Sequence, residues 1–267
     1  MHEGPSPAGP AGGSVVVTND DGIDSPGLHH LAAAAAGTGR SVLVAAPDYE
    51  ASGSSAAMAA VEVGDRIALE RRALPGLDGT TGYAVRAAPA FIAFAAAQGG
   101  FGERPGLLLS GINRGANTGR AVLHSGTVGA ALTAALHHIP AAAFSLDCLT
   151  DSEQHWETAA AVAQEVIGAL DRIAPGLALN VNVPNLPLAD LRGIRYARLA
   201  GFGTVQIQIT APPQEHLELT MSAPPEPLEP GSDHAVLAAG YASVTAVQAI
   251  CEVPAASIPW PAGLDRE

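Results

Sequence analysis

Hydrophobic and polar residues follow one another along this chain in blocks that predict alternating strands and helices. Short apolar runs rich in β-branched residues are typical of buried strands, and longer runs with apolar residues at helical spacing are typical of helices. The predicted strands are residues 14–18, 41–46, 106–109, 141–145 and 177–183, and the predicted helices are residues 27–36, 90–98, 128–138 and 153–173. This alternation predicts an α/β fold with a mostly parallel sheet flanked by helices.

Two regions depart from the alternation. Residues 58–88 predict short strands or a hairpin around the sequence LPGLDGTTGY, and from residue 194 onward β segments are separated by proline-rich stretches, with no helix of useful length. We therefore expect a disordered tail at 1–13, an α/β core at 14–193, a β-rich extension at 194–240 and a C-terminal segment at 241–267. The extension suits an oligomerisation arm, with a cover over its own chain as the alternative, and the C-terminal segment would return to the core or be exchanged with a partner subunit.

Composition restricts the classes of function. The 267-residue chain has a net charge of −13 and no basic run longer than Arg71–Arg72, so we expect no nucleic-acid-binding surface. All thirteen basic residues are arginine, which excludes a P-loop lysine, Schiff-base chemistry and the lysine of haloacid-dehalogenase-like phosphatases. The two cysteines lie far apart and predict neither a zinc site nor a disulfide framework. With no signal-peptide pattern and no apolar stretch of membrane-spanning length, we expect a soluble, cytoplasmic protein.

Two adjacent carboxylates, Asp20 and Asp21, follow the first predicted strand in the sequence NDDG. Because like charges repel, they need water or a cation, although NDDG alone is equally typical of an Asx turn. Two more polar loops follow predicted strands, PDYEASGSS after 41–46 and SGINRGANTGRAVLHSGTV after 106–109. Ligands of doubly wound sheets bind beyond the carboxyl ends of the strands, so we expect these three loops to face one crevice.

The side chains of the three loops are chemically complementary. The carboxylates, together with the neutral oxygens of Ser52, Asn113 and Asn117, suit Mg²⁺ or Mn²⁺ better than zinc or copper. The sequence SGTV, residues 125–128, begins a predicted helix, so its backbone N–H groups and the hydroxyls of Ser125 and Thr127 could bind an anion. The alternative is that Ser125 or Thr127 is only an N-cap. A metal beside a phosphate cradle indicates phosphoryl transfer to water. Neighbouring side chains that could assist are His124, for which a structural role is the alternative, and Arg114 or Arg120.

Seven motifs, in this order over residues 14–248, resemble the SurE (survival protein E) family of metal-dependent 5′/3′-nucleotidases: VTNDDGIDSPGL, VAAPDYEASGSS, LLSGINRGANTG, HSGTVGAAL, FSLD, NVNVP and GSDHAVLAAGYASVT. The resemblance implies a Rossmann-like core, a divalent metal ion and release of phosphate from nucleoside monophosphates. It places the metal at Asp20, Asp21, Ser52 and Asn113, and the phosphate at Asn117, Ser125, Gly126 and Thr127. It also implies a homodimer or homotetramer. Either water attacks the phosphate, or Asp20 or Asp21 acts first as nucleophile or base.

Two stretches depart from the family pattern, RAAPAFIAF and the sequence FGTVQIQIT after RLAG. Both remove polar groups near the expected leaving group, which motivates a narrower hypothesis of a modified nucleotide or another phosphorylated pathway intermediate as substrate. The alternative from another class is a non-catalytic phosphate- or nucleotide-binding regulatory protein on the same fold. A hydride-transferring Rossmann enzyme is disfavoured, because NDDG stands where a GxGxxG turn would approach a pyrophosphate.

Overall fold

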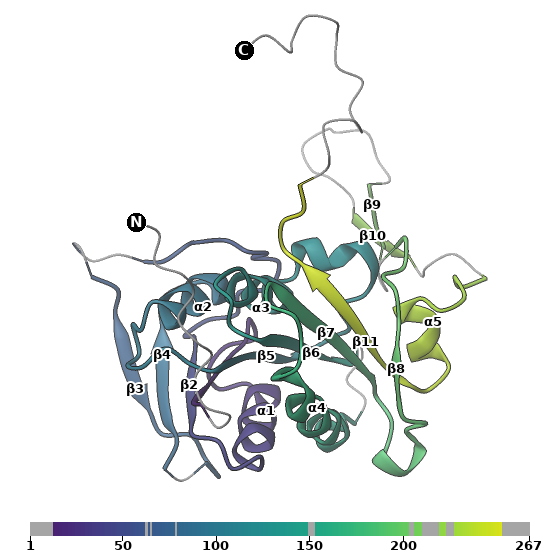
Figure 1. Cartoon of the computed structure of the whole chain (residues 1–267). Coiled ribbons are helices and arrows are strands. Elements are labelled where there is room, and N and C mark those ends of the chain that lie inside the picture. Colours follow the sequence, from purple (N-terminus) through teal and green to yellow (C-terminus); the bar gives the residue numbers. More distant parts are fainter. Residues whose placement is uncertain are drawn as a thin grey trace, which may run out of the picture.

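A nine-stranded sheet forms the centre of the part of the chain that the computed structural model describes, which is residues 13–61, 64, 66–77, 79–148, 153–202, 206–209, 219–222 and 227–252 (Figure 1). Its strands in spatial order are β3 (Leu69–Arg72), β4 (Thr81–Val85), β2 (Val42–Pro47), β1 (Val15–Thr18), β5 (Leu107–Arg114), β6 (Ala141–Asp147), β7 (Leu177–Pro184), β11 (Ala242–Gln248) and β8 (Ile194–Tyr196).

In this sheet the strands from β4 to β7 are mutually parallel, and antiparallel pairing lies only at the two sides of this block. On one side β3 pairs antiparallel with β4, which is the hairpin predicted within residues 58–88. On the other side β11 pairs antiparallel with β7 and parallel with β8. The prediction of a mostly parallel sheet is therefore confirmed, and strands from the C-terminal part of the chain extend it.

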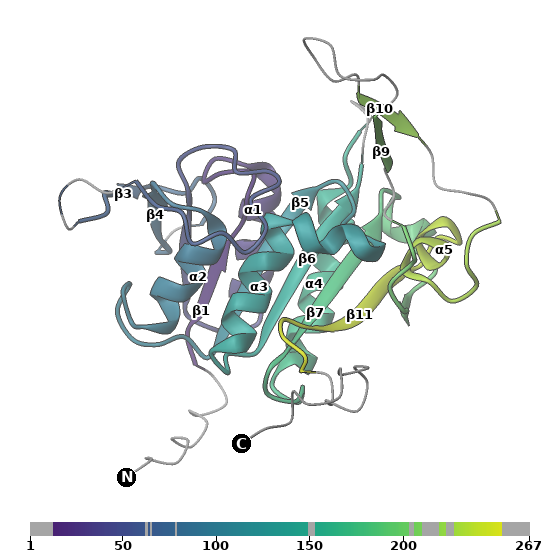
Figure 2. The same cartoon turned by 90° about the horizontal axis from the view of Figure 1, so that it is seen from above.

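Helices cover both faces of the sheet. The first face carries α1 (Pro26–Ala36) and α4 (Trp156–Leu170), which pack on each other, and the second carries α2 (Pro89–Ala97) and α3 (Gly126–Leu136) (Figures 1 and 2). A short helix, α5 (Asp233–Ala238), packs on β7 and β11. Leu28 of α1, Ile167 of α4 and Phe144 of β6 are fully buried in the layer between these two helices and the sheet. The layer between the sheet and α2 and α3 is built mostly of alanines. Small side chains let these helices lie close to the sheet.

The predicted Gly/Asn-rich loop after residue 109 is wrong at its start, because β5 continues to Arg114. Asn113 and Arg114 pair with Ser145 and Leu146 of β6 after a register shift at residues 110–113. Gly111 makes this continuation practicable: its φ is +120°, and a Cβ there would collide with the backbone of Phe144. The SGINR segment is therefore a bulged strand end in which Asn113 stays paired with β6, one residue before the end of β5.

The described residues of the C-terminal region contain a helix of 6 residues, α5, where none of useful length was expected. Ser232 caps α5 by accepting a hydrogen bond from the Ala235 N–H at 3.2 Å, a start signal that the sequence GSDHAV contains. Two further strands, β9 (Gln206–Ile209) and β10 (Leu219–Ser222), pair antiparallel with each other apart from the main sheet (Figure 2). The remaining elements are two short 3₁₀ helices, η1 (Gly119–His124) and η2 (Leu188–Asp190).

Several expectations lie outside the described residues or are not tested by them. The predicted tail, except Gly13, much of the β-rich extension and residues 253–267 fall outside the described part of the chain. The division at residues 13, 193 and 240, the exchange of segments between subunits, the oligomeric state and the cytoplasmic location stay predictions. Among the helices of the described residues, none has the length and hydrophobicity that crossing a bilayer requires.

Candidate functional site

The first turn of α3 holds the side chain of Asp20, which lies immediately beyond β1. Asp20 is only 4% exposed, and its two carboxylate oxygens bind the same residue. Oδ1 accepts a hydrogen bond from the Thr127 hydroxyl at 2.5 Å, and Oδ2 accepts one from the Thr127 N–H at 3.1 Å. The loop with the paired carboxylates and the predicted anion-binding helix start are therefore in direct contact.

The loop after β2 contacts both the Asp20 loop and the segment before α3. The Ala51 N–H donates to the Asp20 carbonyl at 2.7 Å, and the Ser55 hydroxyl donates to the Leu123 carbonyl at 2.6 Å. Gly126 allows the close approach of these segments, because a Cβ there would lie 2.5 Å from Ser54 Oγ and 2.8 Å from Asp20 Oδ2. The structure thus brings the three polar loops together at the carboxyl ends of β1, β2 and β5.

Asp21 faces the end of β5. Its Oδ2 accepts a hydrogen bond from the Arg114 N–H at 3.1 Å, beside Asn113. The Asn113 amide nitrogen donates to the Gly115 carbonyl at 2.7 Å, which leaves its Oδ1 as an acceptor. Ser52 is exposed, and its hydroxyl donates to the Glu50 carboxylate at 3.1 Å, so in this structure it is tied to its own loop.

The two carboxylates are electrostatically unfavourable as they stand. Burial raises the pKa of Asp20, although the hydrogen bonds from Thr127 oppose this shift. Burial, and then the negative charge of Asp20, raise the pKa of Asp21 to about 6. Glu50 adds a further negative charge that acts on both groups. A cation beside Asp20 and Asp21 would relieve this repulsion.

The donor atoms present here fit a hard divalent cation. Among the described residues there is no group of three or more His, Cys, Asp or Glu side chains placed to hold a metal. A metal at this place would therefore combine the carboxylates of Asp20 and Asp21 with the neutral oxygens of Ser52 and Asn113. An all-oxygen set of this kind suits Mg²⁺ or Mn²⁺ and disfavours zinc and copper.

At the start of α3, Ser125 and Thr127 have different roles. Ser125 is the N-cap, and its Oγ accepts the Val128 N–H at 3.1 Å, which leaves the hydroxyl proton available to an anion. Both donors of Thr127 bind Asp20, so Thr127 orients the carboxylate in this structure. The predicted anion site therefore relies on Ser125 and the backbone of Gly126.

The predicted phosphate residue Asn117 is hydrogen-bonded to three buried polar side chains that the sequence analysis did not assign to the site. The Asn117 backbone binds the side chains of Asn180 and Asn182 from β7, and its side chain binds Ser145 from β6. All three partners are 0% exposed. The signal was present in the sequence, because two asparagines at alternate positions of an otherwise apolar central strand need hydrogen-bond partners on one face of the sheet.

The comparison with protein families gives a match that covers the residues of this site. The model described as Survival protein SurE matches residues 15–203, which include every predicted metal and phosphate residue. The chain belongs to the SurE family. The resemblance read from the sequence motifs is thereby confirmed.

Relatives and a solved structure extend the match over most of the chain. A Burkholderia lata protein named 5′-nucleotidase SurE 1 is 36% identical over 241 residues, which are 86% of this chain and 88% of that protein. A Yersinia pestis protein named 5′/3′-nucleotidase SurE is 34% identical over 239 residues, 88% of this chain and 89% of the relative. The crystal structure of the SurE protein from Aquifex aeolicus superposes with a TM-score of 0.73 at 28% identity, covering 88% of this chain and 93% of that one.

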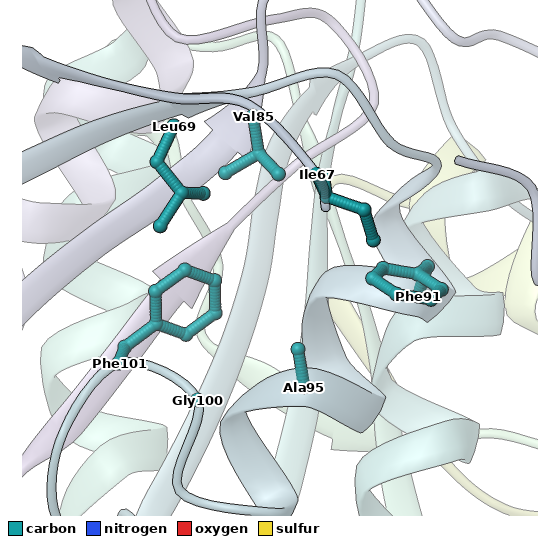
Figure 3. A pocket seen from close by; sticks show the side chains of 7 residues that line it. All are labelled: Ile67, Leu69, Val85, Phe91, Ala95, Gly100 and Phe101. Carbon is teal, nitrogen blue, oxygen red and sulfur yellow. The ribbon is translucent and has the colours of Figure 1, made fainter. Parts of the chain in front are cut away.

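One of the two departures from the SurE pattern contributes to an apolar cavity of about 200 Å³ beside α2. Phe91, from the sequence RAAPAFIAF, lines this cavity, and Phe101 lines it as well (Figure 3). The other lining residues are Ile67, Leu69, Val85, Ala95 and Gly100. None of the predicted metal or phosphate residues of this SurE protein lines the cavity, so it is separate from the carboxylate site.

Proposed function

We propose that this protein is a divalent-metal-dependent phosphomonoesterase that releases phosphate from nucleoside monophosphates. The observation that carries the proposal is the contact between Asp20 and Thr127, which joins the carboxylate pair to the start of α3. A cation-binding group and an anion-binding helix terminus side by side are what a phosphate monoester needs. The relatives' names, 5′-nucleotidase SurE 1 and 5′/3′-nucleotidase SurE, support the same activity.

The residues of the chain divide into three roles in this proposal. Asp20, Asp21, Ser52 and Asn113 would hold the metal, which supplies positive charge against the phosphoryl oxygens when bound. Ser125 and the Gly126 N–H bind the phosphate at the positive end of α3, and Asn117 contributes its side-chain amide. Thr127 keeps Asp20 oriented through two hydrogen bonds. Because the chain contains no lysine, the remaining negative charge of the phosphate is stabilised by backbone amides, hydroxyls and the exposed Arg114 and Arg120.

The test is a phosphate-release assay over AMP, GMP, CMP, UMP and sugar phosphates, each with Mg²⁺, Mn²⁺ or EDTA. We expect release that depends on metal and is abolished by EDTA, and a loss of activity in Asp20→Ala and Asn113→Ala. Asp190→Asn, a change at an exposed carboxylate of η2, is the matched control and should stay active. Full activity of the Asp20→Ala variant in defined metal would refute the proposal, and metal-dependent turnover excludes a protein that only binds nucleotides.

A narrower form of the proposal is that the substrate is a modified nucleotide or another phosphorylated intermediate. Its motive is the replacement of polar residues by Ala90 and Phe91, the second of which lines an apolar cavity. The names of the relatives lend this form no support. If all four common nucleoside monophosphates are hydrolysed well, the narrower form is wrong and the general one stands.

A further inference from the structure

We propose that three buried side chains of the central sheet, Ser145, Asn180 and Asn182, are positioning residues that hold Asn117 in the conformation that binds phosphate. We call these three residues the positioning cluster. The inference rests on the proposed function, because the cluster acts on the substrate only through Asn117. Neither the metal ligands nor the start of α3 belongs to it.

The cluster satisfies both backbone groups of Asn117. Asn182 Oδ1 accepts the Asn117 N–H at 2.7 Å, and Asn182 Nδ2 donates to the Asn117 carbonyl at 3.0 Å. Asn180 Nδ2 donates to the same carbonyl at 2.8 Å. One side-chain amide therefore pairs with a loop residue as a neighbouring strand would, and a second amide strengthens the pairing.

Ser145 fixes the direction of the Asn117 side chain. Its Oγ accepts a hydrogen bond from Asn117 Nδ2 at 2.9 Å. Because an amide nitrogen carries two hydrogens, this bond leaves one N–H and the Oδ1 of Asn117 with a defined orientation. In the proposed function, a phosphate oxygen accepts that remaining N–H.

The surroundings of Asn180 and Asn182 indicate what these two side chains provide. Asn180 and Asn182 alternate with Leu179 and Val181, whose side chains point to the apolar core under α1 and α4. Burying an amide in a central strand is costly unless it is hydrogen-bonded, and an alanine at either position would avoid that cost. The hydrogen bonds of this pair converge on one loop residue, so ordering that residue is what the pair provides.

The loop itself needs such support. Asn117 lies between Gly115 and Gly119, which have φ values of +116° and +57°. Glycine loses more conformational freedom on ordering than any other residue, so a loop of this composition does not hold a single conformation by itself. Asp233 of α5 secures the far end, where its Oδ2 accepts the Gly119 N–H at 2.7 Å. The phosphate contact of Asn117 is thus pre-organised from the sheet.

The experiment compares Asn182→Ala and Ser145→Ala with the control Thr245→Val. Thr245 lies opposite Asn180 in β11 and is 3% exposed, but its hydroxyl has no hydrogen-bond partner among the described residues. In Asn182→Ala we expect the KM for AMP and the inhibition constant of inorganic phosphate to rise about tenfold, because two hydrogen bonds to Asn117 are lost. The concentration of Mg²⁺ or Mn²⁺ for half-maximal activity should not change, and Thr245→Val should match the wild type.

A double-mutant cycle separates positioning from general support of the fold. If Asn182 acts through Asn117, Asn182→Ala adds no further rise in KM to an Asn117→Ala variant. A rise that is additive in the double variant overturns the inference, and so does a lower unfolding midpoint with KM and phosphate inhibition unchanged. If Asn182→Ala does not fold, Ser145→Ala decides, because it removes one oxygen atom and should raise KM about threefold to fivefold.

The outcome for the wild type keeps this inference apart from the proposed function. If the wild type releases phosphate and the variants keep its KM and phosphate inhibition, the positioning cluster is refuted and the proposed function stands. If the wild type releases no phosphate from any nucleotide with Mg²⁺ or Mn²⁺, both are refuted.

Discussion

The charge of Asp21 should destabilise the metal-free protein, so replacing it with asparagine should make that form more stable while removing activity. The fold buries Asp21 beside Asp20 and thereby raises its pKa from an ordinary value of 3.8 to about 6. The asparagine of an Asp21→Asn variant would keep an oxygen for the Arg114 N–H, so the change removes the charge and retains the hydrogen bond. The result would be a stability gained at the expense of metal binding.

The magnitude follows from the shift in pKa. A rise from 3.8 to about 6 is about two units, and each unit corresponds to about 1.4 kcal/mol, which gives about 3 kcal/mol. Because the side chain keeps some contact with water, this is an upper value. The size of the penalty depends on pH: well below pH 3.8 the carboxyl is protonated in both states and costs nothing. Between about pH 4 and pH 6 the unfolded chain ionises first, so the stability of the wild type falls as pH rises, and above pH 6 the full penalty is present.

The assay is urea unfolding of wild type and Asp21→Asn in EDTA at pH 4 and pH 8, with Asp190→Asn as control. We expect the two proteins to differ by less than about 1 kcal/mol at pH 4, and the variant to be more stable by up to about 3 kcal/mol at pH 8. Added Mg²⁺ should stabilise the wild type and have little effect on the variant. An Asp21→Asn protein that is no more stable than wild type at pH 8 in EDTA contradicts the reasoning.

Three more substitutions test the contacts around the site, and a fourth, Gly168→Ala, is a control away from it. Thr127→Val removes the hydroxyl bond to Asp20 and should lower stability by about 1–3 kcal/mol and kcat/KM for AMP at least tenfold, measured by urea unfolding and phosphate release. Gly126→Ala forces a Cβ against the Asp20 carboxylate and should reduce both quantities, whereas Gly168→Ala, an exposed helix position with open space around it, should stabilise by up to about 1 kcal/mol without changing kinetics. Asp233→Ala leaves three backbone N–H groups without their acceptor and should destabilise by about 3 kcal/mol or more in urea unfolding, and stability equal to wild type would contradict this.

The alternating part of the fold was predictable because each element carries its own periodic signal. The valines of β1 and the alanine-rich helices can be recognised from the local sequence, and Pro26 and Pro89 mark two helix starts. The extension of β5 to Arg114 was not predictable in this way. Its residues are polar and glycine-rich, which is typical of a loop, and they are held in the sheet by pairing with β6, a partner about thirty residues further on. Non-local pairing of this kind has no local signature.

The candidate site divides along the same line. Asp20, Asp21 and Ser125 were indicated by their position at a strand end or a helix start, which is a local property. That Thr127 directs both of its donors at Asp20 is a tertiary fact, and no local pattern distinguishes such a threonine from a phosphate donor. Ser52 was indicated by its residue type, which suits a metal, but in the structure its hydroxyl is bonded to Glu50.

Asn180 and Asn182 of β7 were predictable in part. A buried amide is a local anomaly that can be read from the sequence, but its partner can be found only in the structure, since Asn182 and Asn117 are 65 residues apart. A polar residue in a central strand therefore predicts a buried hydrogen bond but does not identify the partner. Here what it binds is the backbone of the loop that the proposed function places against phosphate. The sheet of this protein thus serves the site twice, since its strand ends present the carboxylates and its buried face orders the loop opposite them.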